Sequence, residues 1–295
     1  MNESNPARLM IYWDYDTQWG GDRSRAGQGR RDWGALEFPN TENLMEVHAR
    51  YSIPACFAVV GAAAMPGDRP YHDPAQIRRI HAAGHEVGSH SFHHDWLPGL
   101  KPAEARRTLK SSKEALEQCI GHAVTSFVPP YNQPFHYPQR LAFSLSERRE
   151  AGAGQLGLKQ LCEALKETGY ETCRVAYRPI WKQVAERLTG KRLTGPARVE
   201  TIGGILCVPL NTPCGFDATA RAMLDRSVQE GGLTVVYGHP HSLFTGGPQD
   251  MEHLGPFLKH AAGQIREGRL KAVLPRDLPG TGPELAKQVA GAVNA

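Results

Sequence analysis

Residues 84–94 read GHEVGSHSFHH, in which a short strand-like segment over 86–89 leads directly into a loop that carries three histidines. Asp73 caps a predicted helix over 74–83, because aspartate caps helices and proline favours the first helical position. The glycine that follows this helix ends it. A second helix is predicted over 101–119. The strand and its histidine loop therefore lie between two helices.

The same alternation of strand and helix extends along the chain in both directions. Strands and helices that alternate over short connections indicate a parallel sheet with crossover helices. The predicted strands are 9–13, 55–60, 86–89, 125–128, 171–175, 205–209, 233–237 and 271–274. The predicted helices are 40–51 (capped by Asn40), 74–83, 101–119, 158–168, 181–188, 217–230 (capped by Asp217) and 251–267.

About seven strand-helix units in one chain favour a closed or nearly closed α/β barrel, a distorted (β/α)7-type barrel. We expect one catalytic domain over 1–295, with a core over about 9–275 and a tail over 276–295. A doubly wound sheet is the alternative. The absence of the phosphate-binding pattern Gly-x-Gly-x-x-Gly after a strand argues against it. Residues 27–29 read Gly-Gln-Gly, but two arginines follow and no third glycine stands at the required spacing.

Composition excludes several classes of protein. The 295 residues are 40% hydrophobic with a net charge of +4, which suits a folded core and is not the footprint of a nucleic-acid binder. No apolar run reaches the ~20 residues of a membrane span. The polar N-terminus lacks a signal-peptide pattern, and six scattered cysteines without Cys-x-x-Cys are typical of reduced thiols. We expect a cytoplasmic protein with no membrane span and no nucleic-acid partner, which could form a homo-oligomer.

Polar clusters follow four of the predicted strands. They lie at 14–16, 90–94, 129–132 and 238–241. In a parallel α/β barrel the carboxyl ends of the strands converge on one face, where active sites form. We therefore expect these clusters to meet.

His90 and His94 are four residues apart, a spacing that on a helical turn places both imidazoles on one face. Together with one carboxylate they would form a His₂Asp set with open positions, as catalytic zinc requires. The alternative is a polar surface loop. The position of the loop after a strand, opposite an Asp-x-Asp segment, favours a metal site.

Asp14 and Asp16 alternate at the end of the first strand, so both side chains can point the same way. Two neighbouring carboxylates repel each other unless one binds a cation or a proton. If they were caps, a helix would begin directly after Asp16, yet residues 17–21 read Thr-Gln-Trp-Gly-Gly. We expect one carboxylate to be a metal ligand and the other to be a base.

His239 precedes Pro240 at the end of a late strand, and its ordinary pKa near ~6.5 suits proton donation near neutrality. His241 is a close competitor for this role. Basic residues could meet a phosphate or form a solvated loop: Arg23, Arg25, Arg30 and Arg31. Tryptophans near the motifs could stack on a sugar ring or pack: Trp19, Trp33 and Trp96.

These motifs resemble those of the polysaccharide deacetylase family, also called the NodB-homology or carbohydrate esterase 4 family, over roughly residues 10–274. The match is full at 90–94, which fits the pattern His-Ser/Thr-x-x-His, and at 12–16 the chain reads Tyr-Trp-Asp-Tyr-Asp. That Asp-x-Asp form resembles a branch with cytoplasmic peptidoglycan-deacetylase-like and allantoinase-like members. The resemblance implies that Asp14 is the catalytic base and that Asp16 binds the metal with His90 and His94.

The third and fifth motifs of the family assign further roles. Tyr131 keeps its place in a motif that normally reads Arg-x-Pro-Tyr, and its backbone N–H would stabilise the oxyanion. Val128 stands where the family has an arginine that tethers the base. No acidic fourth motif is found over 205–211, so this tether is either absent or rebuilt from elsewhere. The fifth motif fits His239 as the general acid.

The resemblance implies an N-deacetylase that uses one divalent ion, zinc, to release acetate from an N-acetylated amino sugar or glycan intermediate. Candidate substrate-binding residues are Trp19, Trp96, Pro130 and His241. Two alternatives remain. One is a cyclic-imide or ureide amidohydrolase on the same fold, and the other is a catalytically silent carbohydrate-binding relative.

Overall fold

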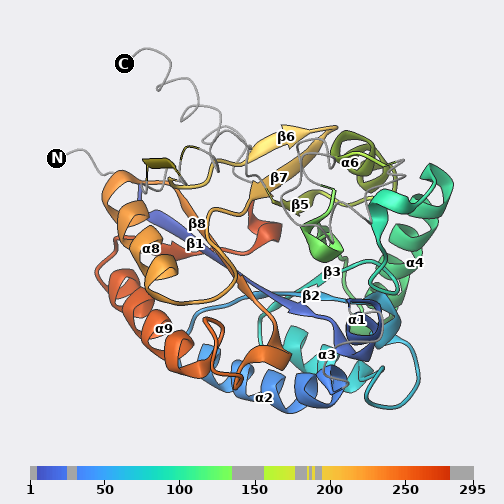
Figure 1. The fold of residues 1–295 in the computed structure, drawn as a ribbon, viewed down its shortest axis with the longest axis horizontal. Coiled ribbons are helices and arrows are strands. Elements are labelled where there is room, and N and C mark those ends of the chain that lie inside the picture. The colour runs from blue at the N-terminus through green and yellow to red at the C-terminus, as the bar shows by residue number, and fades with distance from the viewer. Residues whose placement is uncertain are drawn as a thin grey trace.

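The computed structural model describes residues 5–24, 32–134, 156–176, 185, 188–189 and 195–279. Its described part is a single α/β domain with one curled sheet (Figure 1). The strands are β1 (Ala7–Tyr15), β2 (Cys56–Val59), β3 (Glu86–Ser89), β4 (Ser126–Phe127), β5 (Thr172–Val175), β6 (Glu200–Ile202), β7 (Ile205–Pro209), β8 (Leu233–Gly238) and β9 (Leu270–Ala272).

The strand order is β6-β7-β5-β4-β3-β2-β1-β8, and β9 pairs with the start of β1. Pairing is parallel except between β6 and β7, which are antiparallel. Among the described residues, a single antiparallel bridge between Ala197 and Leu233 links the segment before β6 to β8. The sheet is therefore curled and nearly closed, as expected. The antiparallel β6 was not predicted.

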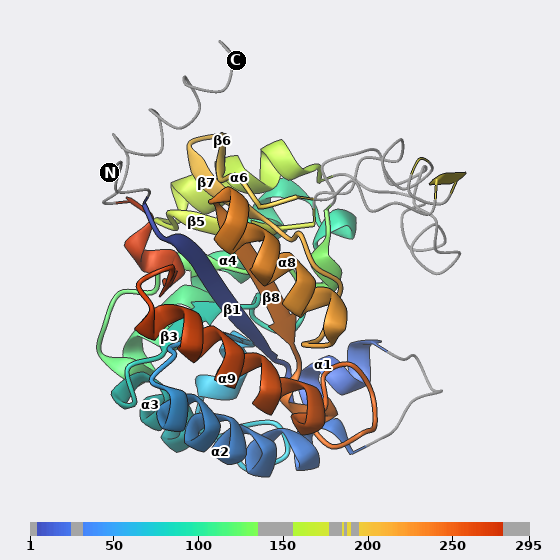
Figure 2. The ribbon, with the colours of Figure 1, turned by 90° about the vertical axis from the view of Figure 1, so that its left-hand side faces the viewer.

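Helices cover the outer face of the curled sheet (Figure 2). They are α1 (Thr17–Ser24), α2 (Trp33–Tyr51), α3 (Pro74–Ala82), α4 (Pro102–Ile120), α6 (Leu158–Glu167), α8 (Ala218–Glu230) and α9 (Met251–Arg266). The predicted caps Asp73 and Asp217 are confirmed, because each carboxylate accepts backbone N–H groups of the helix that it precedes. Most of the helix predicted over 181–188 lies outside the described residues.

Two predictions at the start of the chain were wrong. Helix α1 begins directly after Asp16, although the glycine-containing segment was not expected to be helical. Helix α2 begins at Trp33 rather than at the predicted cap Asn40, and Pro39 lies inside it. The amide of Asn40 instead donates to the carbonyl oxygen of Pro240, 2.8 Å away, so this side chain joins the helix to a distant loop.

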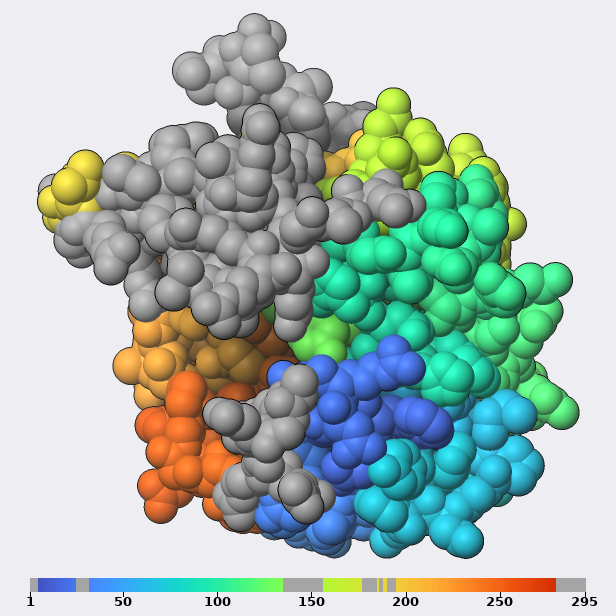
Figure 3. All heavy atoms as spheres, turned by 45° about the vertical axis from the view of Figure 1, so that its right-hand side comes forward, coloured from blue at the N-terminus to red at the C-terminus, as the bar shows by residue number. Residues whose placement is uncertain are grey.

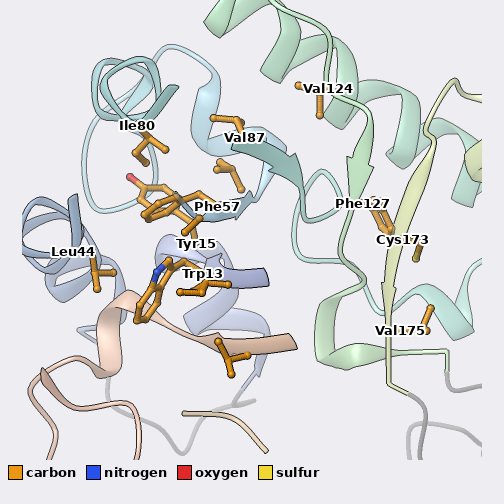
Figure 4. Close-up of a cluster of buried hydrophobic side chains, with 14 of the residues drawn as sticks. Trp13, Tyr15, Leu44, Phe57, Ile80, Val87, Val124, Phe127, Cys173 and Val175 are labelled. Carbon is orange, nitrogen blue, oxygen red and sulfur yellow. The ribbon is translucent and has the colours of Figure 1, made fainter. Parts of the chain in front are cut away.

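Side chains of β1 alternate between two hydrophobic clusters, as the period of two in a strand requires. Leu9, Ile11, Trp13 and Tyr15 pack between the sheet and the helices. Figure 4 shows part of this outer cluster. The residues between them on the strand, such as Tyr12, face the interior of the curled sheet. This alternation decides which residues at the strand ends point inward.

Candidate metal centre and active site

The predicted site residues lie at the carboxyl end of the sheet, and Asp14 and His239 continue the inward-facing rows of their strands. Asp14 follows Tyr12 on the interior face of β1, and His239 continues the inward row of Val235 and Tyr237 on β8. His90 follows β3, whose neighbour in the sheet is β2. The clusters after β1, β3, β4 and β8 thus meet, as the sequence predicted. Figure 3 shows α1, in dark blue, beside green residues from the middle of the chain.

Asp16, His90 and His94 form a buried cluster whose potential ligand atoms lie within 4.8 Å of one another. The Oδ1 atom of Asp16 is 3.3 Å from Nε2 of His90 and 3.5 Å from Nε2 of His94. This oxygen is buried and has no hydrogen-bond partner in the described part of the chain. A buried carboxylate oxygen without a partner is costly unless it meets a cation. The three groups therefore fit a divalent metal ion.

The Nδ1 atoms of His90 and His94 contact groups outside the Asp-His-His cluster. Nδ1 of His90 lies 2.7 Å from the carbonyl oxygen of Val128, to which it donates. Nδ1 of His94 lies 3.2 Å from the hydroxyl group of Tyr131. Such contacts fix the tautomer and the orientation of metal-binding imidazoles. Both Nε2 atoms are thereby turned toward Asp16.

The protonation states of Asp16 and His94 suit metal binding. Burial lowers the pKa of His94 to about 4, against the opposing effect of Asp16, so the imidazole is neutral near pH 7. Burial would raise the pKa of Asp16, but the neighbouring histidines His94 and His90 outweigh it and the pKa is lowered. A carboxylate and neutral imidazoles are the forms that bind zinc.

The loop that carries the histidines is not the helical turn that their spacing indicated. It is irregular, and Ser91 and His94 have positive φ angles of 62° and 57°. The hydroxyl group of Ser91 accepts the backbone N–H of Asp95 at 2.7 Å, which closes the loop locally. The two imidazole centroids are nevertheless 5.0 Å apart. The predicted proximity is present, although a different backbone produces it.

Asp14 does not belong to the Asp-His-His cluster but is bound by an arginine that the sequence did not identify. Nη1 and Nη2 of Arg174 donate to Oδ1 and Oδ2 of Asp14, both at 2.6 Å. Nη2 also donates to Oδ1 of Asn132 at 2.9 Å. Burial would raise the pKa of Asp14, but the charge of Arg174 outweighs it, so the pKa is lowered and the carboxylate is ionised.

His239 faces Asp14, with 3.8 Å between its Nε2 atom and Oδ2 of the carboxylate. On its other side, Nδ1 lies 2.9 Å from Oε1 of Gln249 and 3.7 Å from Sγ of Cys214. Burial would lower the pKa of His239, but Cys214 and the carboxylates raise it well above its ordinary value. A protonated imidazole that faces a base across a small gap has the properties of a general acid.

His241 has a different environment. Its Nδ1 atom lies 3.2 Å from Oε2 of Glu37, a fully buried carboxyl group. Its ring stacks on Trp33, with 4.1 Å between the centroids. Burial, followed by the charge of Asp16, raises the pKa of Glu37. His241 is therefore packed into the wall of the site, and neither its contact with Glu37 nor Glu37 itself was predicted.

The candidate substrate-binding residues lie near the centre, in different environments. Trp19 is half-buried among Tyr71, His72 and His93. Trp96 is also half-buried, and its ring meets that of Tyr131 edge-on at 5.2 Å. Pro130 is buried. Of the four arginines, Arg23 pairs with Asp95 at 3.2 Å, and residues 25, 30 and 31 lie outside the described residues.

The alternation of side chains along β5 is the signal that could have identified Arg174. Cys173 and Val175 belong to the outer cluster, so the arginine between them must point into the curled sheet. A buried arginine needs a carboxylate or another acceptor. The sequence of one short strand, however, does not reveal which carboxylate on another strand its arginine will contact.

Comparison with known proteins agrees with this geometry. Residues 32–147 match the sequence model of the family described as polysaccharide deacetylase. The chain is 26% identical over 91 residues to a peptidoglycan-N-acetylglucosamine deacetylase of Listeria monocytogenes, covering 31% of this chain and 18% of the relative. It is 29% identical over 84 residues to a chitooligosaccharide deacetylase of Bradyrhizobium, covering 28% of this chain and 36% of the relative.

The fold is similar to the crystal structure of a polysaccharide deacetylase-like protein from Mycobacterium smegmatis, with a TM-score of 0.55 and 17% identity. That alignment covers 92% of this chain and 94% of the other. The curled α/β sheet with a buried Asp-His-His cluster at its carboxyl end defines a class of α/β proteins whose strand ends can hold a divalent metal ion. Within that class, this chain has the fold of the Mycobacterium smegmatis protein, and its residues 32–147 match the polysaccharide deacetylase model. In the described residues, no helix is long and apolar enough to cross a membrane.

Proposed function

We propose that this protein is a zinc-dependent amide hydrolase that removes the acetyl group from an N-acetylated amino sugar, either free or linked to a nucleotide or lipid. The observation that carries the proposal is the unpartnered Oδ1 atom of Asp16, which two imidazoles face, with Asp14 and His239 beside it. The substrate class is supported by the names of the two deacetylases that the chain resembles, of which it matches 18% and 36% of the length.

Asp16, His90 and His94 would hold the ion. When bound there, zinc supplies a polarised carbonyl group and a water of lowered pKa. Asp14, ionised by its contact with Arg174, takes the proton of the attacking water. The backbone N–H of Tyr131 donates to the oxyanion that forms. These roles require the substrate carbonyl to lie between Asp14 and the metal ligands.

His239 then donates its proton to the departing nitrogen, because an amine leaves readily only when it is protonated. The raised pKa of His239 keeps that proton available near pH 7. The C–N bond breaks, water supplies the hydroxyl group of acetate, and the sugar keeps a free amine. We assign this step to His239 rather than His241 because Nε2 of His239 faces Asp14.

The proposal includes a reducing compartment such as the cytoplasm. All six cysteines are free, and the buried Cys162 and Cys207 have sulfur atoms 3.7 Å apart. Titration of thiols in protein purified without reductant and then denatured should find six. Fewer than six would contradict this part of the proposal.

The function is tested with two isosteric variants of the same strand end. The purified protein should contain about one zinc per chain and release acetate from N-acetylglucosamine, its UDP-linked form or a chitooligosaccharide. Asp16→Asn should lose the metal, whereas Asp14→Asn should keep it and lose turnover. Zinc is measured by elemental analysis and acetate by a coupled assay.

Other outcomes would identify the rival functions. Turnover of hydantoin-type cyclic amides without acetate release would indicate the imide or ureide hydrolase. Sugar binding with no turnover of any substrate would indicate a silent binding protein. A wild-type protein that takes up no zinc would contradict the metal centre itself.

A further inference from the structure

Arg174 lies on the strand next to the position where the family resemblance expects an arginine. In the parallel pairing of β4 with β5, Ser126 is opposite Thr172 and Phe127 is opposite Cys173. Continuing this register by one residue places Val128 opposite Arg174. The two residues are therefore neighbours at the same level of the sheet.

Both side chains point into the curled sheet. Phe127 and Cys173 belong to the outer cluster, so the next residue on each chain faces inward. Val128 accordingly packs in the interior cluster, and the side chain of Arg174 is fully buried, with 0% exposure. An arginine on either strand would enter the same interior space. The guanidinium group of Arg174 reaches Asp14 from there.

Two side chains accept hydrogen bonds from the terminal nitrogens of the Arg174 guanidinium group. Two parallel bonds of 2.6 Å join it to both oxygens of Asp14, the bidentate geometry that fixes the orientation of a carboxylate. Asn132 accepts a third bond at 2.9 Å. The rings of Tyr237 and Tyr12 lie 4.6 Å and 5.2 Å from the guanidinium carbon.

We propose that Arg174 is the positioning residue for the base Asp14, and that this chain has moved the tethering arginine from residue 128 to the neighbouring strand. Asn132 takes the place of an acidic partner for that arginine. The inference rests on the proposed function, because it names what holds the base of that reaction. Arg174 thereby compensates for the absence of an arginine at residue 128, and the protein remains active.

The decisive experiment exchanges the two residues and so conserves the volume of the interior. Arg174→Val should lower kcat by about 100-fold, since a base displaced by ~1 Å loses its alignment, with KM changed by less than about threefold. Its zinc content should match that of the wild type. The exchange variant Arg174→Val/Val128→Arg should recover kcat by at least about tenfold over the single variant.

Asn132 provides a milder test that keeps the arginine in place. Asn132→Asp should retain kcat, because aspartate still accepts the bond from Nη2, whereas Asn132→Ala should lower it. Retention of wild-type kcat by Arg174→Val would overturn the proposal. So would a joint loss of zinc and kcat in Arg174→Val that the exchange variant does not reverse.

A second readout does not depend on turnover and separates this proposal from the proposed function. The melting temperatures of Asp14→Asn, Arg174→Val and the double variant form a cycle. The double variant should lose much less than the sum of the two single losses, because each single variant leaves a buried partner unpaired. Additive losses would contradict the tether. If the wild-type protein were inactive but the cycle were non-additive, the proposed function would be refuted, whereas the contact between Arg174 and Asp14 would be confirmed.

Discussion

Two histidines follow β8, and their neighbours give them different chemistry. His239 faces Asp14 and contacts a neutral amide on its other side, whereas His241 contacts the buried Glu37 and stacks on Trp33. His239→Gln should lower kcat by about 10²–10⁴-fold, the usual contribution of a general acid. His241→Gln should have a smaller effect on kcat. Steady-state kinetics of both variants decide the assignment, and the reverse order would transfer the role to His241.

At the same scale, the hydroxyl group of Tyr131 contacts Nδ1 of His94, which we propose as a metal ligand. Tyr131→Phe removes this contact and should weaken zinc binding by about 10-fold, as loss of a group that orients a ligand usually does. Competition with a zinc-binding dye measures the affinity. Tyr71→Phe is the control, because the hydroxyl group of Tyr71 contacts Asp22 at the surface, 2.7 Å away. Equal affinities in both variants would refute the role of Tyr131.

At the scale of the element, α1 packs so closely behind the end of β1 that it requires a glycine. A methyl group on Gly20 would lie 2.5 Å from Cβ of Asp16, whereas the nearest atom to one on Gly21 would be the side-chain nitrogen of Gln18 at 3.1 Å. Alanine is favoured over glycine in helices by about 1 kcal/mol. Gly20→Ala should lower the zinc content, because the added methyl group displaces Asp16, but it should not lower the helix content. Gly21→Ala should keep both the zinc content and the helix content. Elemental analysis and circular dichroism would show the difference.

The elements that could be predicted are those with local signals. The helix after Asp217 and the strand over 205–209 follow from a cap and a buried run, and both have the predicted bounds. Helix α1 was missed because two adjacent glycines argue against a helix when their contact with Asp16 is unknown. The bond from Arg174 to Asp14 joins residues 160 positions apart, so it has no local pattern.

At the scale of the whole molecule, two core histidines make the fold sensitive to acid. Nε2 of His48 accepts the indole N–H of Trp13 at 2.9 Å, and Nδ1 of His85 accepts the backbone N–H of Ala55 at 3.1 Å. Both nitrogens must remain unprotonated. Burial lowers the pKa of His48 to about 3 and that of His85 to about 4.

The unfolded chain takes up these protons below a pH of about 6.5, whereas the folded protein does not until the lowered pKa values are reached. The free energy of unfolding should thus fall as the pH falls below 6.5, by about 2 kcal/mol at pH 5 for His48 alone. Thermal unfolding of chelator-treated protein measures this. His48→Gln keeps an acceptor and a donor but cannot take up a proton, so its dependence on pH should be shallower. A slope equal to that of the wild type would refute the assignment.

The neighbouring inward positions of Val128 and Arg174 have a consequence for how such chains diverge. A charged residue that acts inside a curled sheet can change its position in the sequence and still reach the same site. This requires that the two strands are adjacent and paired in register. Ancestors with arginine at both positions would tolerate the loss of either one. Descendants would then share an arrangement of charges that a column-by-column alignment records as missing.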